Sequence, residues 1–184
     1  MLATVLGAAV FFFGLVGGRA AQAAVLPEAG PAVTSGIDYA LPYPGILPDS
    51  PVYFLKVWRD DAVLWLTRDS TEKSFFLLLM ADKRLAAARM LTGKGEKGLG
   101  ATTAVLAENY FSRAVTQVEN QQSGKRSEGL LAKLAVAGAK HTEVIGELAN
   151  EVSGRDSAAV QMASRENLES RNRVQKLLTG AVKK

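Results

Sequence analysis

Five stretches of the chain carry apolar residues at spacings of three and four, the period that places one face of an α-helix against a core. They cover residues 51–67, 70–91, 101–122, 127–152 and 157–178. No stretch sustains the alternating pattern of a β-strand. We therefore predict an all-α fold, an elongated antiparallel bundle of about five helices preceded by an extended proline-rich strap.

The third and fourth stretches have the most regular stripes, and their small alanines allow close approach of neighbouring helices. The last stripe is weaker and more polar, which favours a groove open to a partner or to a second copy. The stripes predicted to face the core consist of Phe75, Leu78, Ala81 (or Asp82), Leu85 and Ala88; Ala104, Ala107, Phe111, Ala114 and Val118; Leu130, Leu134, Ala137, His141, Val144, Leu148 and Val152; and Val160, Ala163, Asn167, Val174 and Leu178.

The first stretch repeats Leu55, Trp58, Ala62 and Trp65 on one stripe. Trp58 and Trp65 lie two turns apart on the same face. Such a pair is more often part of a core than a platform for a ligand. We expect this stripe to pack against the rest of the bundle.

Capping residues predict three helix starts. Ser50 followed by Pro51 fits an N-cap and a first helical position. Asp69, with Glu72 three residues later, resembles a capping box for the second helix. Asp156 is the expected N-cap of the last helix.

The segment 92–100, TGKGEKGLG, is the clearest break in the helical pattern. Glycine costs roughly 1 kcal/mol per helical position relative to alanine, so no helix is expected to persist there. The segment lacks the Gly-Lys-Ser/Thr ending of a phosphate-binding loop. We interpret it as a linker between a hairpin at 50–91 and the helices of 101–180, within a helical domain spanning 50–180.

Residues 24–49 form the predicted lead-in and strap, with LPYPGILP at 41–48. Proline fixes φ and removes a hydrogen-bond donor, so this segment should be extended or turning. We expect it to bury Leu41, Tyr43, Ile46 and Leu47 against the first or second helix. The alternative is a proline-rich ligand for a partner's aromatic groove, although basic residues do not flank a repeated Pro-x-x-Pro spacing.

Residues 1–23 have the pattern of an export signal. An apolar run at 5–18 is followed by Ala21-Gln22-Ala23, which fits the small-x-small cleavage pattern. No Lys or Arg precedes the run, and Arg19 follows it, which is opposite to the usual bias. An uncleaved anchor is therefore the alternative, although the run is shorter than the roughly 20 apolar residues of a spanning helix. Either way, we expect the protein to be exported to the cell envelope.

Composition excludes several kinds of site. The chain has no cysteine, so it can form neither a disulfide nor a cysteine-based metal site. The net charge of +4 is mild and the signs are mixed, which argues against nucleic-acid binding. The C-terminal end is more basic, and weak contact with an anionic membrane or cell-wall surface is the alternative to an ordinary solvated face. Its basic residues, diluted by Glu166 and Glu169, are Arg165, Arg171, Arg173, Lys176, Lys183 and Lys184.

Candidate catalytic or metal-binding residues are few. His141 is the only histidine, and Gly138 stands where a Glu-x-x-His pair would have its acid. We interpret His141 as a hydrogen-bonded core histidine, near Glu143 and Glu147. No nucleophile triad is evident, and the adjacent acids Asp60 and Asp61 point apart on a helix. We predict no catalytic, cofactor-binding or metal site and no cofactor, so the protein is expected not to be an enzyme.

Residues 47–88 resemble a bacterial family of unknown function with a Leu-Pro-Asp-Ser-Pro start, a Tyr-x-Leu-Lys helix and a Leu-Thr-x-Asp turn. The resemblance implies an exported or membrane-anchored helical domain and supplies no catalytic residue. The sequence departs from it at 86–88, where alanines replace the expected acidic residues. The residues that fit the pattern are Pro48, Asp49, Ser50, Pro51, Tyr53, Leu55, Lys56, Leu66, Thr67, Asp69, Lys73, Ala81, Arg84 and Leu85.

Together these features predict a non-enzymatic interaction or structural module outside the cytoplasmic membrane, with a protein partner or self-association. The alternative is an envelope stress-linked chaperone, or a sensory or regulatory domain that binds unfolded or partner proteins. The candidate motif residues are Pro48, Asp49, Ser50, Pro51, Tyr53, Leu55, Lys56, Trp58, Trp65, Asp69 and Arg84.

Overall fold

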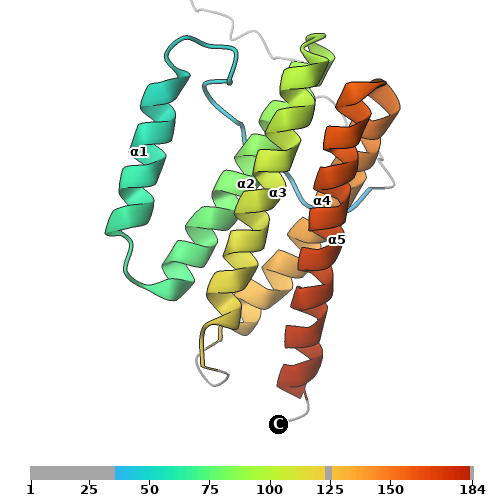
Figure 1. Ribbon diagram of the computed structural model, residues 1–184. Helices are drawn as coiled ribbons and strands as arrows, with labels where there is room; N and C mark the ends of the chain where they lie inside the picture. The colour runs from blue at the N-terminus through green and yellow to red at the C-terminus, as the bar shows by residue number, and fades with distance from the viewer. Residues whose placement is uncertain (1–35, 123–125, 183–184) are drawn as a thin grey trace, which may run out of the picture. The chain divides into compact units, whose positions relative to one another are not determined.

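The computed structural model describes residues 36–122 and 126–182 (Figure 1). These residues form five α-helices and no strand, which confirms the predicted all-α fold. The predicted export segment at 1–23 lies outside the described residues. The helices are α1 (Tyr53–Leu66), α2 (Ser70–Gly93), α3 (Lys97–Glu119), α4 (Glu128–Glu151) and α5 (Arg155–Val182).

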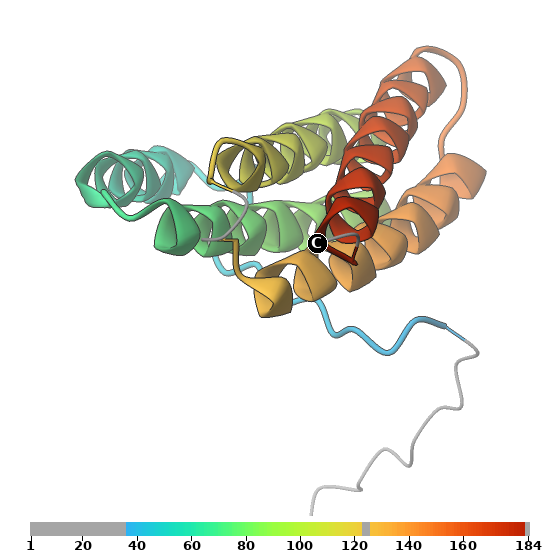
Figure 2. The same ribbon diagram turned by 90° about the horizontal axis from the view of Figure 1, so that it is seen from below.

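Successive helices run in opposite directions, and α2 to α5 form the bundle (Figure 1). Helix α2 packs mainly on α3, α4 on α5, and α3 also on α5, whereas α1 touches α2 only lightly. Figure 2 shows α3 and α5 on one side of the bundle, α2 and α4 on the other, and α1 beside α2. No described helix is long and apolar enough to span a bilayer.

The observed helix starts agree with the predicted caps in one of three cases. Asp69 caps α2 by accepting hydrogen bonds from the backbone N–H groups of Thr71 and Glu72, at 2.9 and 2.8 Å. The prediction for Ser50 is wrong, because its carbonyl accepts the Tyr53 N–H at 3.1 Å in a turn that precedes α1.

The start predicted for the last helix is also wrong. Asp156 lies within the first turn of α5, where its charge still favours the helix N-terminus.

The glycine-rich break is much shorter than predicted. Only residues 94–96 separate α2 from α3, and α3 includes Gly98 and Gly100. A Cβ atom at Gly100 would come within 2.3 Å of Thr92 Oγ1 on α2. The close packing of these two helices requires glycine at this position and outweighs its low helix propensity.

The core has two large apolar clusters with four polar side chains between them, and a third, small cluster under the strap. The four polar side chains, which we call the polar layer, are Asp82, Glu108, His141 and Asn167, one from each helix of the bundle. The stripes predicted for α3 and α4 are buried throughout, and so is that of α5 except for the half-buried Leu178. The clusters contain Leu78, Ala81, Phe111, Ala114, Leu130 and Leu134 on one side, and Leu85, Ala88, Ala104, Val144, Leu148 and Val160 on the other.

The strap, residues 36–52, crosses the outer face of α2 and α4 (Figure 2). Its Leu47 is buried against Ala87 and Leu91 of α2, and Leu41 is half-buried against the second cluster. The predicted burial of Tyr43 and Ile46 is wrong, because these side chains are 75% and 44% exposed.

Candidate functional site

Helix α1 has two chemically different faces, and its most apolar face points away from the bundle. We call Phe54, Leu55, Trp58, Trp65 and Leu66 the aromatic face of α1. These side chains are between 54% and 83% exposed, with Trp58 at 74% and Trp65 at 83%. The prediction that this stripe lies in the core is therefore wrong.

The inward face of α1 is mainly polar. Asp60 is fully buried and pairs with Arg59 at 2.7 Å, and Leu64 is the buried apolar residue of this face. Lys56 donates to the carbonyl oxygens of Pro44 and Ile46 in the strap, at 2.6 and 3.1 Å. Burial lowers the pKa of Lys56, and the charge of Asp60 partly offsets this effect.

The reason for this orientation lies on α2, which presents the buried Arg84 to α1. Its guanidinium stacks on the ring of Tyr110 at 4.0 Å, and its Nη2 donates to the Tyr110 hydroxyl at 3.3 Å. Burial raises the pKa of the neighbouring Tyr53 hydroxyl, while the charge of Arg84 lowers it. The face of α1 with Lys56 and Asp60 therefore lies near a charged site on α2, and the large apolar residues of the aromatic face are left outside.

The contact between α1 and α2 is incompletely hydrogen-bonded. Asp60 Oδ2 and Arg84 Nη1 are buried, and neither has a hydrogen-bond partner in the described part of the chain. An unsatisfied buried polar atom costs about 1–3 kcal/mol. Helix α1 is therefore held to the bundle more weakly than the other helices are held to one another.

The predicted motif residues at the start of α1 shape the turn that leads into the helix. Asp49 pairs with Lys94 at 2.9 Å, which ties the strap to the turn between α2 and α3. The Ser50 N–H donates to the carbonyl of Leu47 at 3.0 Å, and Pro51 is exposed. Together with the half-buried Pro48, these residues form a structural entry to α1 rather than a cluster of reactive groups.

Sequence reasoning missed the polar layer. His141 is fully buried, with Nδ1 at 2.8 Å from Glu108 Oε1 and Nε2 at 3.0 Å from Asp82 Oδ1. The interpretation as a hydrogen-bonded core histidine is confirmed, but its partners are not the predicted neighbours Glu143 and Glu147. Burial lowers the pKa of His141, but the nearby Glu108 and Asp82 outweigh this effect and raise it to about 9. The ring is therefore an imidazolium at neutral pH.

Further hydrogen bonds extend the polar layer to the strap and to α5. The Tyr39 hydroxyl of the strap donates to Asp82 Oδ2 at 2.6 Å, and Asn167 Nδ2 donates to Glu108 Oε2 at 2.9 Å. Thr142 Oγ1 donates to Asn167 Oδ1 at 2.7 Å. The signal in the sequence was three polar residues, Asp82, Glu108 and Asn167, each within an otherwise apolar part of a helix.

The polar layer is closed to substrates and unsuited to a metal ion. Its four residues are each at most 4% exposed. Both ring nitrogens of His141 are already bonded to carboxylates, so neither is free for a metal. No group of three potential ligands that could hold a metal ion occurs among residues 36–122 and 126–182. A Cβ at Gly138 would also lie 2.9 Å from the Phe111 ring, so an acidic side chain could not be placed there.

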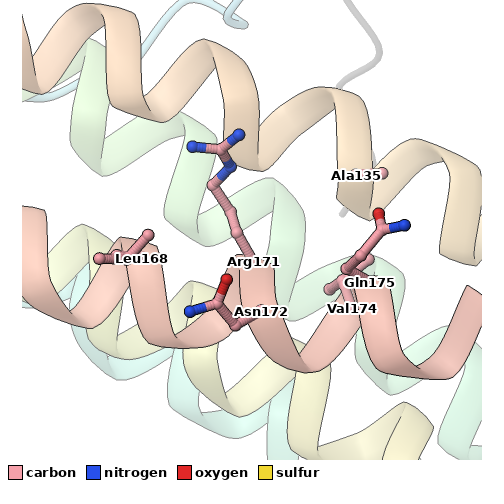
Figure 3. Close-up of a pocket in the computed structure, with 6 residues that line it drawn as sticks. All are labelled: Ala135, Leu168, Arg171, Asn172, Val174 and Gln175. Atoms are coloured by element: carbon pink, nitrogen blue, oxygen red, sulfur yellow. The ribbon is translucent and has the colours of Figure 1, made fainter.

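The bundle surface has shallow hollows. One, of about 210 Å³, lies between α4 and α5, and Figure 3 shows Arg171 extending from it toward α4. Its volume is below the roughly 300 Å³ of the smallest ligand pockets. A hollow of about 500 Å³ lies between the strap and α2, but its cations Arg89 and Lys140 are already paired with Glu147 and Glu143. It therefore offers no unpaired cation for an anionic ligand.

The polar stripe of α5 is partly engaged within the bundle. A hollow of about 370 Å³ remains between α4 and α5, with Thr142, Ala149 and Gln161 in its lining, and its use as a groove for a partner stays a prediction. Asn167 belongs to the polar layer, and Arg173 donates to Ser112, Thr116 and Glu119 of α3. Its hydrogen bond lowers the pKa of the Glu119 carboxyl. Part of the basic C-terminal end is thus used inside the protein, and contact with an anionic surface remains a prediction.

Comparison with known proteins gives one match. Residues 45–155 match the family described as "Domain of unknown function (DUF5667)", and this range contains α1 to α4 and the segment 47–88. No curated protein and no solved structure matches the sequence. Since the match covers more than half of the chain, the protein belongs to this family of unknown function.

Proposed function

We propose that this protein is a non-enzymatic helical interaction module and that α1 is its docking element. The observation that carries this proposal is the aromatic face of α1, with Trp58 and Trp65 at 74% and 83% exposure. Tryptophan is among the residues most enriched in binding hot spots. Large exposed apolar patches on soluble domains mark interaction sites.

The energetics of α1 support a partner on this face. Full burial of a large apolar side chain is worth about 1.5–3 kcal/mol, and the face has five such side chains. The helix gains little of this energy from its own bundle, because its inward contacts are polar and incompletely satisfied. A partner that covers the aromatic face would stabilise α1 and be held by it.

A second candidate function is that of a chaperone for unfolded proteins. The same exposed face favours it, because apolar surface is what an unfolded client would contact. The two functions differ in stoichiometry and selectivity. An interaction module binds one partner at a fixed ratio, whereas a chaperone binds many clients and suppresses their aggregation at stoichiometric amounts.

We place this function in the cell envelope. The support is the apolar run at 5–18 and the Ala21-Gln22-Ala23 pattern. Sequencing the N-terminus of the protein from its own cells tests this placement. A new N-terminus at residue 24 would establish export with cleavage, and a full-length chain in the cytoplasmic fraction would contradict it.

The test of the interaction function is crosslinking in intact cells, followed by capture of the tagged full chain and mass spectrometry. Wild type is compared with Trp58→Glu/Trp65→Glu and with the control Leu168→Glu, a change at a 56% exposed position on α5. We expect one dominant species at near-equal amount, either another protein or the chain itself, with at least a 10-fold loss in the double variant alone. Equal capture by all three proteins would contradict the proposal, and a broad set of clients would favour the chaperone.

A further inference from the structure

We propose that the aromatic face of α1 pairs with the same face of a second copy of this chain, the two α1 helices running parallel. This inference rests on the function proposed above and names its partner. Its two supports are the spacing of the face and the charges at its edges.

The spacing of the face matches that of a helix built to lie along an identical helix. Leu55, Trp58, Ala62 and Trp65 follow one another at intervals of three, four and three, as the two core positions of a heptad do. In a parallel pair each of them meets its own counterpart at the same level. The small Ala62 between two tryptophan layers allows the helix backbones to approach.

Charges at the two edges favour a copy in the parallel direction. Arg59 bonds to the buried Asp60 through Nε and Nη2, but its side chain is 63% exposed and its Nη1 remains for a second carboxylate. Asp61 is also exposed, and residues two apart lie on nearly opposite sides of a helix, so the two charges flank the aromatic face on different edges. In a parallel two-fold pair, the edge with Arg59 meets the edge with Asp61 of the second copy, and this happens twice. In an antiparallel pair each edge would meet its own equivalent, which places like charges together.

The size of the face fits a reversible dimer. Helix α1 has 14 residues and is therefore about 21 Å long. Five large apolar side chains from each copy would bury on the order of 1,000 Å² in total, the lower limit for a specific interface. We expect dissociation in the micromolar range.

A membrane surface fits the same face less well. Asp61 lies three residues after Trp58 and four before Trp65, so its carboxylate borders the residues that would enter the lipid. Interfacial helices instead place basic residues beside the apolar face. A second copy can pair this carboxylate with Arg59, which a lipid surface cannot do.

The chain has no cysteine, so one introduced cysteine reports a single contact. Leu55→Cys in the full chain tests the pairing while both tryptophans are kept. In a parallel pair the two sulfur atoms meet at the same level, whereas in an antiparallel pair centred on the face the two residues are about 15 Å apart along the axis. We expect mild oxidation to give at least 10-fold more disulfide dimer than Met162→Cys, a control at a 53% exposed position on α5.

Adding Trp65→Glu to Leu55→Cys should abolish this dimer, while adding Leu168→Glu should leave it unchanged. Circular dichroism checks that each variant is folded, which we expect because both changed side chains are exposed. Pairing through the aromatic face is supported if the disulfide dimer of Leu55→Cys is lost when Trp65→Glu is added and is kept when Leu168→Glu is added. Equal crosslinking in both backgrounds would overturn it.

Other outcomes separate this inference from the proposed function. A disulfide between Leu55→Cys and Trp65→Cys chains, without the Leu55→Cys dimer, would overturn the parallel arrangement. A photo-crosslinker at position 65 that joins one other protein would show that the partner is not a second copy, but it would leave the interaction function standing. A crosslink from position 65 to residues 1–35 of the same chain would also contradict pairing with a second copy. Binding to vesicles of neutral and anionic phospholipid that requires Trp65, with no protein adduct, would overturn both.

Discussion

His141 has no contact with solvent, and both of its ring nitrogens lie within hydrogen-bond distance of an acidic side chain. A charged group in such a place is stable only while its partners stay with it. Glu108 and Asp82 are held in turn by Asn167 and Tyr39. Through these contacts, one histidine connects four helices and the strap.

The charge of His141 predicts that the protein becomes less stable as pH rises. The pKa of His141 is about 9 in the folded protein, above its ordinary value of 6.5. Its contribution is therefore complete below pH 6.5 and is lost as pH rises through 9. We expect the free energy of unfolding, measured with denaturant, to fall by up to about 3 kcal/mol between pH 6 and pH 10.

His141→Gln is the control for this experiment. It cannot be charged, so its stability should be lower at pH 6 and should change less across the same range. The groups that face His141 are Glu108 and Asp82, with Tyr39 bonded to the latter. A wild-type protein with constant stability from pH 6 to 10, or an equal slope in the variant, would show that the imidazolium contributes nothing.

Among the elements, the strap depends on few contacts, and one of them reaches the polar layer. The Tyr39 hydroxyl bonds to Asp82, and the Ile37 N–H donates to Glu143 Oε2 at 3.0 Å. Tyr39→Phe removes one hydrogen bond and leaves a buried carboxylate oxygen without its donor. We expect a loss of about 1–3 kcal/mol and at least 10-fold faster amide hydrogen exchange in residues 37–47.

Tyr43→Phe makes the same chemical change on the same strap. Its side chain is 75% exposed, so stability and exchange should match those of wild type. Equal exchange in the two variants would mean that the strap is held by its apolar contacts and not by the hydrogen bond to the polar layer.

The elements also show which features the sequence could predict. The stripes of α3 and α4 are buried, as predicted. Their small and apolar residues recur at the helical spacing of three and four, and this spacing identifies the apolar face of a helix. For α1 the same spacing identified the apolar face correctly, but that face is exposed. Whether an apolar face is buried depends on the side chains that the neighbouring helix presents to it. The polar side of α1 lies near the buried Arg84 of α2, and no pattern within α1 contains that information.

The polar layer escaped prediction for a similar reason. Asp82, Glu108 and Asn167 lie far apart in the sequence, and each alone is an ordinary interruption of a stripe. These side chains come together at His141 only because the four helices are positioned along the bundle axis so that the residues lie at the same height. The glycine-rich break was overestimated because helix propensity does not include the gain from close contact of Gly100 with Thr92.

At the scale of the whole molecule, the family match and the bundle end at different places. The match stops at residue 155, where α5 begins. Yet α5 contributes Val160, Ala163 and Val174 to the core and Asn167 to the polar layer. In this protein the matched segment therefore does not contain the complete core.

A chain shortened after Arg155 should fail to fold. Each buried apolar side chain of α5 is worth about 1.5–3 kcal/mol, and several are lost against a total stability of about 5–15 kcal/mol. We expect no cooperative thermal transition by circular dichroism, while a chain ending at Thr179, which keeps every residue that is buried within 155–180, should unfold much as the full chain does. A separate peptide covering 156–179 should restore the transition when added to the shortened chain. A cooperative transition without α5 would instead show that α1 to α4 form a sufficient core, so that the matched segment can fold without α5.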